Sequence, residues 1–180
     1  MKNKFLKGFL LLVILISTSI LLPLLSTNNY KVKINKSVNI DILKSENKPY
    51  ILLYFGYVGC VNSCMPRLKE IANIYKKVNN ENFEFYFINL LKNSNSKEAK
   101  LFAKSFHKKF NGIYLNEKDL NKLTKEFKLF YSKSFLNEYE INHTSFLYLI
   151  EREKNIYKLK NIYIAKPFSN KIIDDLKNLI

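Results

Sequence analysis

The chain has 180 residues, with 30 lysine and arginine residues against 15 aspartate and glutamate residues, for a formal net charge of +15. This length fits one domain with a proper hydrophobic core. All basic residues except Arg67 and Arg152 are lysines, whereas proteins that bind phosphates usually use arginine for bidentate contacts, so we expect a solvated lysine surface and no nucleic-acid partner.

The N-terminal segment 1–29 differs from the rest of the chain. Three lysines precede the run 9–25, which is almost wholly apolar, a pattern typical of a signal peptide or a short membrane anchor. Counted from Phe5, the run approaches the roughly 20 residues that a bilayer core requires. No small-x-small cleavage signature follows it, so we favour one uncleaved transmembrane helix. The positive-inside rule then predicts a single-pass inner-membrane protein with its C-terminal domain in the periplasm or an equivalent compartment.

Residues 30–48 read as a linker with a short alternating edge strand at 31–35, and one domain is expected over 49–180. The continuous apolar run 50–55 is typical of a central strand that is covered on both faces. After a bend with two glycines, apolar residues recur every three or four positions over 64–78, which predicts an amphipathic helix.

The next elements are a core strand over 83–90, a helix over 97–106, an extended piece over 112–115 and a helix over 117–130. The apolar residues Leu101, Phe102 and Phe106 are expected to face inward from the first helix, and Leu120, Leu123, Phe127 and Phe130 from the second.

An irregular stretch over 131–142 precedes a predicted antiparallel hairpin of strands 145–150 and 156–164. A helix over 169–179, with Ser169 as its N-cap, closes the chain. This order of elements predicts an α/β fold: a central mixed sheet, with a parallel core and an antiparallel edge, flanked by helices.

Cys60 and Cys64, the only cysteines of the chain, lie where the apolar strand gives way to the helix. If both were on a regular helical turn, their Cβ atoms would be about 5 to 6 Å apart, whereas a disulfide needs about 3.5 to 4.5 Å. A metal ion that binds both thiolates requires less distortion of the turn than a disulfide does. A helix N-terminus also favours the thiolate form of cysteine. The structural alternatives are a plain disulfide, which would close too short a loop to stabilise much, and a pair of buried small residues.

A third ligand would come from one of two histidines. His107 lies between basic residues at a helix end and is most simply a solvated surface group, whereas His143 lies just before the strand 145–150, at the sheet edge that presents the cysteines. Two thiolates and one imidazole suit copper or zinc. Zinc would seek a fourth ligand, and Met65 is more simply a packing residue, whereas three-coordinate Cu(I) needs nothing more.

Three segments together resemble the SCO/SenC family of membrane-anchored copper proteins. They are Tyr-Phe-Gly-Tyr-x2-Cys-x3-Cys at 54–64, the segment 103–112, and the segment 143–150 that begins with His143. The resemblance implies a thioredoxin-like fold and a copper ion held by Cys60, Cys64 and His143. It also implies a metallochaperone that delivers copper to, or helps assemble, the dinuclear copper centre of cytochrome c oxidase, with the copper-accepting subunit of that oxidase as its partner.

The chain departs from the family pattern at three places. Met65 stands where proline usually follows the second cysteine, and Pro66 comes one residue later; 89–96 has neither aspartate nor proline; and Asn142 replaces a common aspartate before His143. These departures leave the ligand set intact and bear on partner docking and on the tuning of His143.

The alternative function is a membrane-tethered thiol–disulfide reductase, in which Cys60 and Cys64 are catalytic: one attacks a partner's disulfide and the other resolves it. The extra residue between the cysteines and the absence of a proline before the strand 145–150 argue against ordinary thioredoxin activity.

Overall fold

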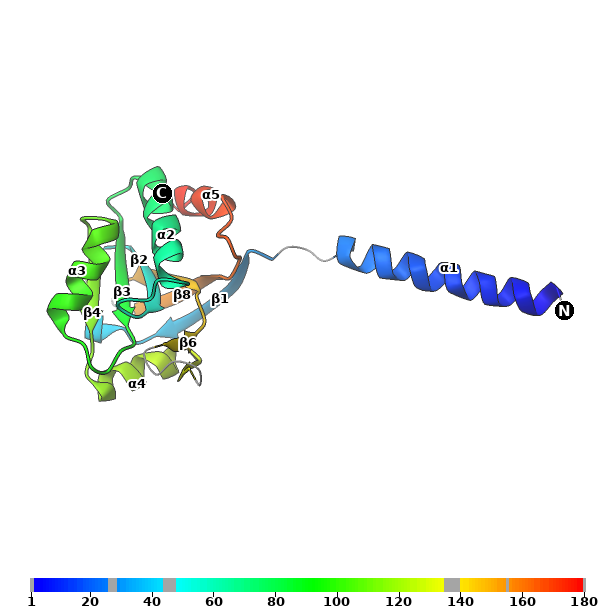
Figure 1. Ribbon diagram of the computed structural model, residues 1–180. Helices are drawn as coiled ribbons and strands as arrows, with labels where there is room; N and C mark the ends of the chain where they lie inside the picture. The colour runs from blue at the N-terminus through cyan, green and yellow to red at the C-terminus, as the bar shows by residue number, and fades with distance from the viewer. Residues whose placement is uncertain (1, 26–28, 44–47, 135–139, 155, 180) are drawn as a thin grey trace.

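The computed structural model describes residues 2–25, 29–43, 48–134, 140–154 and 156–179. Figure 1 shows a central sheet with helices on both of its faces. Six strands form this sheet in the order β1-β8-β7-β2-β3-β4, and β5 and β6 form a separate two-stranded sheet.

The described helices are α1 (Lys2–Leu25), the 3-10 helix η1 (Asp41–Leu43), α2 (Cys64–Val78), α3 (Ser96–Phe106), α4 (Glu117–Glu126) and α5 (Lys171–Lys177). The described strands are β1 (Lys31–Val38), β2 (Tyr50–Gly56), β3 (Phe83–Asn89), β4 (Phe110–Tyr114), β5 (Tyr131–Lys133), β6 (Ile141–His143), β7 (Leu147–Glu153) and β8 (Ile156–Tyr163).

The six-stranded sheet is mixed, as the order of elements predicts. Strands β2, β3 and β4 pair in parallel, while β7 runs antiparallel to β2, β8 to β7, and β1 to β8. The parallel strands need helical crossovers, which α2 and α3 supply, and the antiparallel strands β7 and β8 need only a tight turn. The result is an α/β sheet with a parallel core and an antiparallel edge.

Strand β2 lies at the centre of the core and is covered on both faces, which confirms the interpretation of its continuous apolar run. Leu52 and Tyr54 pack into a cluster with residues of α2, α3 and α5, while Ile51, Leu53 and Phe55 pack into a second cluster with residues of α4. The alternation follows from the two-residue period of a strand. Both clusters therefore anchor the strand that leads into the loop with Cys60.

Two side chains that were expected to face inward are exposed. Leu101 on α3 is 60% exposed, and Phe130, which lies beyond the end of α4, is 74% exposed. Helix α3 instead buries Ala99 and Ala103 because it runs very close to β4: a Cβ on Gly112 would lie 1.8 Å from the carbonyl oxygen of Ala99. Only small residues fit this contact, so the larger Leu101 lies outside it.

Several boundaries differ from the predicted ones. Strand β1 extends to Val38, α4 ends at Glu126 instead of residue 130, and β7 begins at Leu147. The stretch expected to be irregular contains β5 and β6, although its residues 135–139 lie outside the described ones. The N-cap of α5 is Asn170 instead of Ser169, whose hydroxyl oxygen accepts a hydrogen bond from the Lys171 N–H at 3.2 Å.

The N-terminal segment forms the helix α1, and its described apolar side chains are largely exposed, with Leu10 and Leu15 at 61% and 62%. Across the described part of the chain, no helix combines the length and the apolarity that a membrane span requires. Residues 1 and 26–28 of the segment lie outside the described ones. The transmembrane helix expected within 1–29 therefore stays a prediction.

Candidate metal centre

The two cysteines lie on either side of the start of α2. Cys60 precedes the helix, and its N–H donates to the carbonyl oxygen of Tyr57 at 3.3 Å, while Cys64 is the first helical residue. Gly59 makes the preceding bend with a φ of 86°, a left-handed conformation that glycine adopts without strain. The sequence analysis considered the case in which both cysteines lie on one regular helical turn. In the structure Cys60 instead lies in the loop before the helix, and this loop brings the sulfur of Cys60 toward that of Cys64.

Both thiols are free and buried. The Cys64 N–H donates to the sulfur of Cys60 at 3.1 Å, as expected of an unpaired amide at a helix start, and the Ser63 hydroxyl lies 3.0 Å from the same sulfur. Hydrogen bonds from the side chains of Cys64 and Ser63 lower the pKa of Cys60 against the opposing effect of burial. The bond with Cys60 and burial raise the pKa of Cys64. Cys60 is therefore the thiolate of the pair.

His143 reaches the cysteines from β6. Its Nε2 lies 3.3 Å from the sulfur of Cys64, and its Nδ1 donates to the backbone carbonyl oxygen of Thr144 at 3.1 Å. A hydrogen bond on one ring nitrogen fixes the tautomer and leaves the other nitrogen as a ligand. The imidazole therefore presents the lone pair of Nε2 to the thiols.

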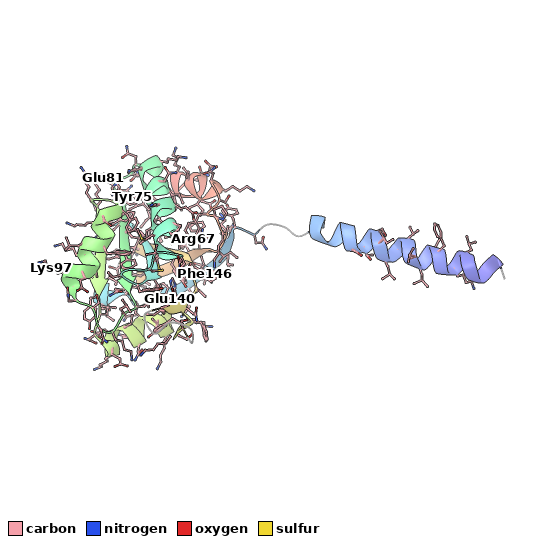
Figure 2. All side chains as sticks on the ribbon, in the orientation of Figure 1. Arg67, Tyr75, Glu81, Lys97, Glu140 and Phe146 are labelled. Carbon is pink, nitrogen blue, oxygen red and sulfur yellow. The ribbon has the colours of Figure 1, made fainter. Side chains whose placement is uncertain are left out.

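The ligand atoms of Cys60, Cys64 and His143 all lie within 4.8 Å of one another, and no other such group of metal-binding side chains occurs among the described residues. Two thiolates and one imidazole form a soft to intermediate donor set. The structure thus brings together the three residues that the sequence singled out. In Figure 2, Arg67, three residues after Cys64, and Phe146, three residues after His143, lie in the same region of the domain, away from Lys97 on α3.

His107 does not belong to this group, in agreement with the sequence analysis, but the expectation of a solvated side chain was wrong. The ring is half-buried and contacts the rings of Tyr75 and Phe110, with centroids 5.0 and 5.2 Å away. Burial and the charges of neighbouring lysines lower its pKa. Its role is aromatic packing between α2 and β4.

The missing aspartate before His143 has no visible consequence for the imidazole. The Asn142 side chain is exposed, and Thr144 already satisfies Nδ1 through its backbone. A carboxylate at position 142 would therefore point away from the ring.

Asn89, a residue that the sequence analysis did not single out, holds the cysteine loop. It is fully buried at the end of β3, and its side-chain oxygen accepts from the N–H groups of Val58 at 3.1 Å and Leu91 at 3.4 Å. It thereby joins the loops that follow β2 and β3. The signal in the sequence was a single amide within the otherwise apolar end of a core strand.

Comparison with known proteins gives two kinds of relative. The chain is 32% identical over 120 residues to the SCO2-like protein RP587 of Rickettsia prowazekii (strain Madrid E), covering 63% of this chain and 58% of that protein. It is 29% identical over 136 residues to the SCO2-like protein RT0576 of Rickettsia typhi (strain ATCC VR-144 / Wilmington), covering 71% and 64%. The matches thus span less than two thirds of the length of these relatives.

Among solved structures, apo Sco1 from Thermus thermophilus matches with a TM-score of 0.64 at 20% identity, covering 86% of this chain and 95% of that one. Bradyrhizobium japonicum ScoI with copper bound matches with a TM-score of 0.64 at 18% identity, covering 83% and 99%. These similarities confirm the thioredoxin-like α/β fold. The SCO1/SenC family itself matches residues 40–180, and the chain therefore belongs to the SCO1/SenC family.

Proposed function

We propose that this protein is a copper-binding metallochaperone that delivers copper to, or helps assemble, the dinuclear copper centre of cytochrome c oxidase. The observation that carries the proposal is the grouping of three donor atoms, from Cys60, Cys64 and His143, within 4.8 Å of one another. Structures of the same fold from Bradyrhizobium japonicum and yeast have copper bound, and BsSco is described as a member of a family of cytochrome c oxidase assembly proteins.

The three residues would hold copper through two thiolate sulfurs and Nε2 of His143. Copper is the cargo, so the site must release it as well as bind it. Cys60 and Cys64 are buried, but His143 is half-buried and Val61, between the cysteines, is 66% exposed. A partner can therefore approach from the loop side and take the ion by exchanging its own ligands for these three, one at a time.

The proposed partner is the copper-accepting subunit of cytochrome c oxidase, and the proposed location is the inner membrane, with the domain in the periplasm. The three lysines before the apolar run 9–25 support this orientation. The proposal includes attachment through the N-terminal helix, whose described apolar side chains are largely exposed.

The second candidate is a thiol–disulfide reductase. The opposite pKa shifts of the two cysteines favour this function. Cys60 accepts the hydrogen bonds of the pair, and its pKa is lowered while that of Cys64 is raised. A thiolate beside a thiol can attack a partner's disulfide, forming a mixed disulfide that the second cysteine then resolves. The partner's cysteines are reduced and the Cys60–Cys64 pair is oxidised.

Copper binding by the full-length, reduced chain in detergent, kept anaerobic, tests the first function. We expect one copper per chain, lost in Cys60→Ser and Cys64→Ser and retained in His107→Ala, whose side chain lies outside the ligand group. No copper above background, with the two thiols cycling to a disulfide, would overturn the chaperone and leave the reductase.

A further inference from the structure

A hollow lies where the chain enters the domain, between the start of β1 and the end of β8. Asn29 and Tyr30, just before β1, line it together with Lys166, Ser169 and Lys171, which follow β8. Figure 1 shows the segment between β8 and α5 beside the start of β1. The volume of this basic hollow is about 690 Å³. It therefore offers room for a small ligand at a place that the metal centre does not use.

Tyr30 holds the two sides of the basic hollow together. Its hydroxyl donates to Oδ2 of Asp175 on α5 at 3.0 Å, and its carbonyl oxygen accepts from the Ile164 N–H at 3.0 Å. The ammonium group of Lys171 lies 5.7 Å from the centroid of the Tyr30 ring. The entry of the chain is thus joined both to the end of β8 and to α5, so the hollow is formed before any ligand binds.

The charged groups that line the basic hollow are cations. Lys166 and Lys171 are both exposed, and neither belongs to an ion pair among the described residues. No acidic side chain lines the hollow within the described part of the chain. The carboxylate of Asp175, which contacts Tyr30, is already paired with Lys31 at 2.6 Å. The hollow therefore carries a positive charge that no protein group balances there.

The charge and the hydrogen-bonding groups suit a phosphate. Lysine ammonium groups bind phosphate as point charges. The Ser169 hydroxyl oxygen accepts from the Lys171 N–H at 3.2 Å, so its own hydrogen is left for another acceptor, and the Asn29 amide is a further donor. Phosphate oxygens accept all of these bonds. The ligand class is therefore a phosphate anion, whether it is free or part of a lipid headgroup.

The position of the basic hollow favours a lipid as the source of that phosphate. Helix α1 ends at Leu25, and Asn29 comes four residues later, a stretch that spans at most about 14 Å when fully extended. This step rests on the proposed membrane attachment through α1, which places Leu25 at the boundary of the apolar core. The headgroup layer beyond that boundary is roughly 5 to 8 Å thick, so lipid phosphates are within reach of the hollow.

The basic hollow also lies at the sheet edge that carries the metal centre. Lys31 at the start of β1 is opposite Tyr163 of β8, which is itself opposite Leu147 of β7. Leu147 is in turn opposite Tyr54, near the end of β2, and β2 leads into the loop with Cys60. Neighbouring strands are about 4.8 Å apart, so three such steps, or about 14 Å, separate the start of β1 from the end of β2. A membrane contact at the hollow therefore brings the metal centre toward the same surface.

We propose that the basic hollow binds the phosphate of an anionic phospholipid headgroup through Lys166, Lys171 and Ser169, and that this contact holds the metal centre close to the membrane surface. A lysine near an anionic membrane surface strengthens binding about fivefold. The two lysines of the hollow together should therefore supply about 25-fold in lipid affinity.

The test uses the full-length chain in bicelles of phosphatidylcholine, into which phosphatidylglycerol is introduced in steps while NMR follows the amides of Lys166, Ser169 and Lys171. These amides should shift and reach saturation. Lys166→Gln/Lys171→Gln should bind the anionic lipid about 25-fold more weakly. The matched control is Lys104→Gln/Lys108→Gln, which removes the same charge from two exposed lysines of a different hollow, one that carboxylates also line. It should bind the lipid like the unmodified chain.

Three results would overturn the lipid site. The first is the absence of shifts as phosphatidylglycerol enters the bicelles. The second is equal weakening in both double variants, which would mean that a basic protein is attracted diffusely to an anionic surface. The third is the same set of shifts from glycerol phosphate in bicelles of phosphatidylcholine alone, which would assign the hollow to a free phosphate compound.

The orientation of the metal centre has a readout of its own. Val61, between the cysteines, is 66% exposed. A spin-labelled lipid headgroup should broaden the Val61 amide signal more with phosphatidylglycerol than without it, and less in Lys166→Gln/Lys171→Gln. Broadening that responds to neither change would overturn the orientation.

Hydrogen exchange of the α1 amides in the same bicelles reports on the attachment separately. Protected α1 amides without shifts in the basic hollow would overturn the lipid site and leave the proposed attachment standing. Unprotected α1 amides would overturn the proposed attachment, and with it the lipid as the source of the phosphate.

Discussion

The sulfur of Cys64 and Nε2 of His143 lie 3.3 Å apart although 79 positions separate them in the sequence. The pairing of β2 with β7 explains this contact. These strands are antiparallel neighbours, with Tyr54 opposite Leu147, so the end of β2 and the beginning of β7 lie at the same edge of the sheet. The loop after β2 and the segment before β7 must therefore meet there.

Replacing His143 with alanine should weaken copper binding while leaving the thiols reactive. The imidazole supplies one of three donors, so its loss should cost more than the roughly 10- to 100-fold that removing an outer partner of a ligand costs. Chelator competition measures the affinity, and alkylation of the two cysteines measures the thiols.

His107→Ala is the matched control for this substitution, because His107 packs on Tyr75 and Phe110 instead of the cysteines. It should bind copper like the unmodified chain. Equal affinity of His143→Ala and His107→Ala would show that the assignment of His143 as a ligand is wrong.

The sequence predicted the parts of the fold in which burial follows a local period. Strand β2 is buried on both faces, and its sequence is a continuous apolar run. Helix α2 is buried on one face, and its apolar residues recur every three or four positions. The prediction failed where a contact with a residue far away in the sequence determines which side chain is buried. Leu101 is exposed because Gly112 brings β4 against the alanines of α3, and no local pattern reports that approach.

The candidate site divides in the same way. The three ligand positions could be predicted because their residue types are rare in this chain and lie at strand ends that share an edge. The role of Asn89 could not be predicted, because its partners are backbone groups, among them the N–H group of Val58, 31 positions away in the sequence. Backbone groups are the same at every position, so the sequence carries no sign of which one a side chain will bind.

Gly56→Ala should disturb the metal centre from the end of β2. A Cβ at this position would lie 2.9 Å from Cε2 of Phe87 and 3.1 Å from the sulfur of Cys64, so one of these groups must move. Overpacking of this kind costs about 1 to 3 kcal/mol of the free energy of unfolding, which urea denaturation would measure, and the moved sulfur should also lower the copper affinity. Gly8→Ala, whose Cβ would meet no atom within 4 Å, should change neither quantity; a Gly56→Ala protein with unchanged stability and affinity would contradict the geometry of this turn.

The reduced, metal-free protein should lose stability relative to Cys60→Ser as the pH falls. The pKa of Cys60 is lowered by its bond from Cys64, so ionisation of Cys60 favours the folded state. This contribution is fully present above the ordinary thiol pKa of about 8.5 and declines as the pH falls toward the lowered value. Urea denaturation of both proteins between these limits measures the difference, and the ultraviolet absorbance of the thiolate should persist below the ordinary pKa only in the chain that retains Cys60. A pH-independent difference in stability would contradict the lowered pKa.

Asn89→Ala should loosen the cysteine loop by removing the acceptor for two backbone N–H groups, those of Val58 and Leu91. A buried donor left without a partner costs about 1 to 3 kcal/mol, so the free energy of unfolding should fall by at least that amount in urea denaturation. Asn89→Asp keeps the side-chain oxygen and should bind copper more tightly than Asn89→Ala, because Val58 stays in place beside the loop that carries Cys60. Equal copper affinity in the two variants would mean that the position of the loop depends on the cysteines and the start of α2 instead of on Asn89.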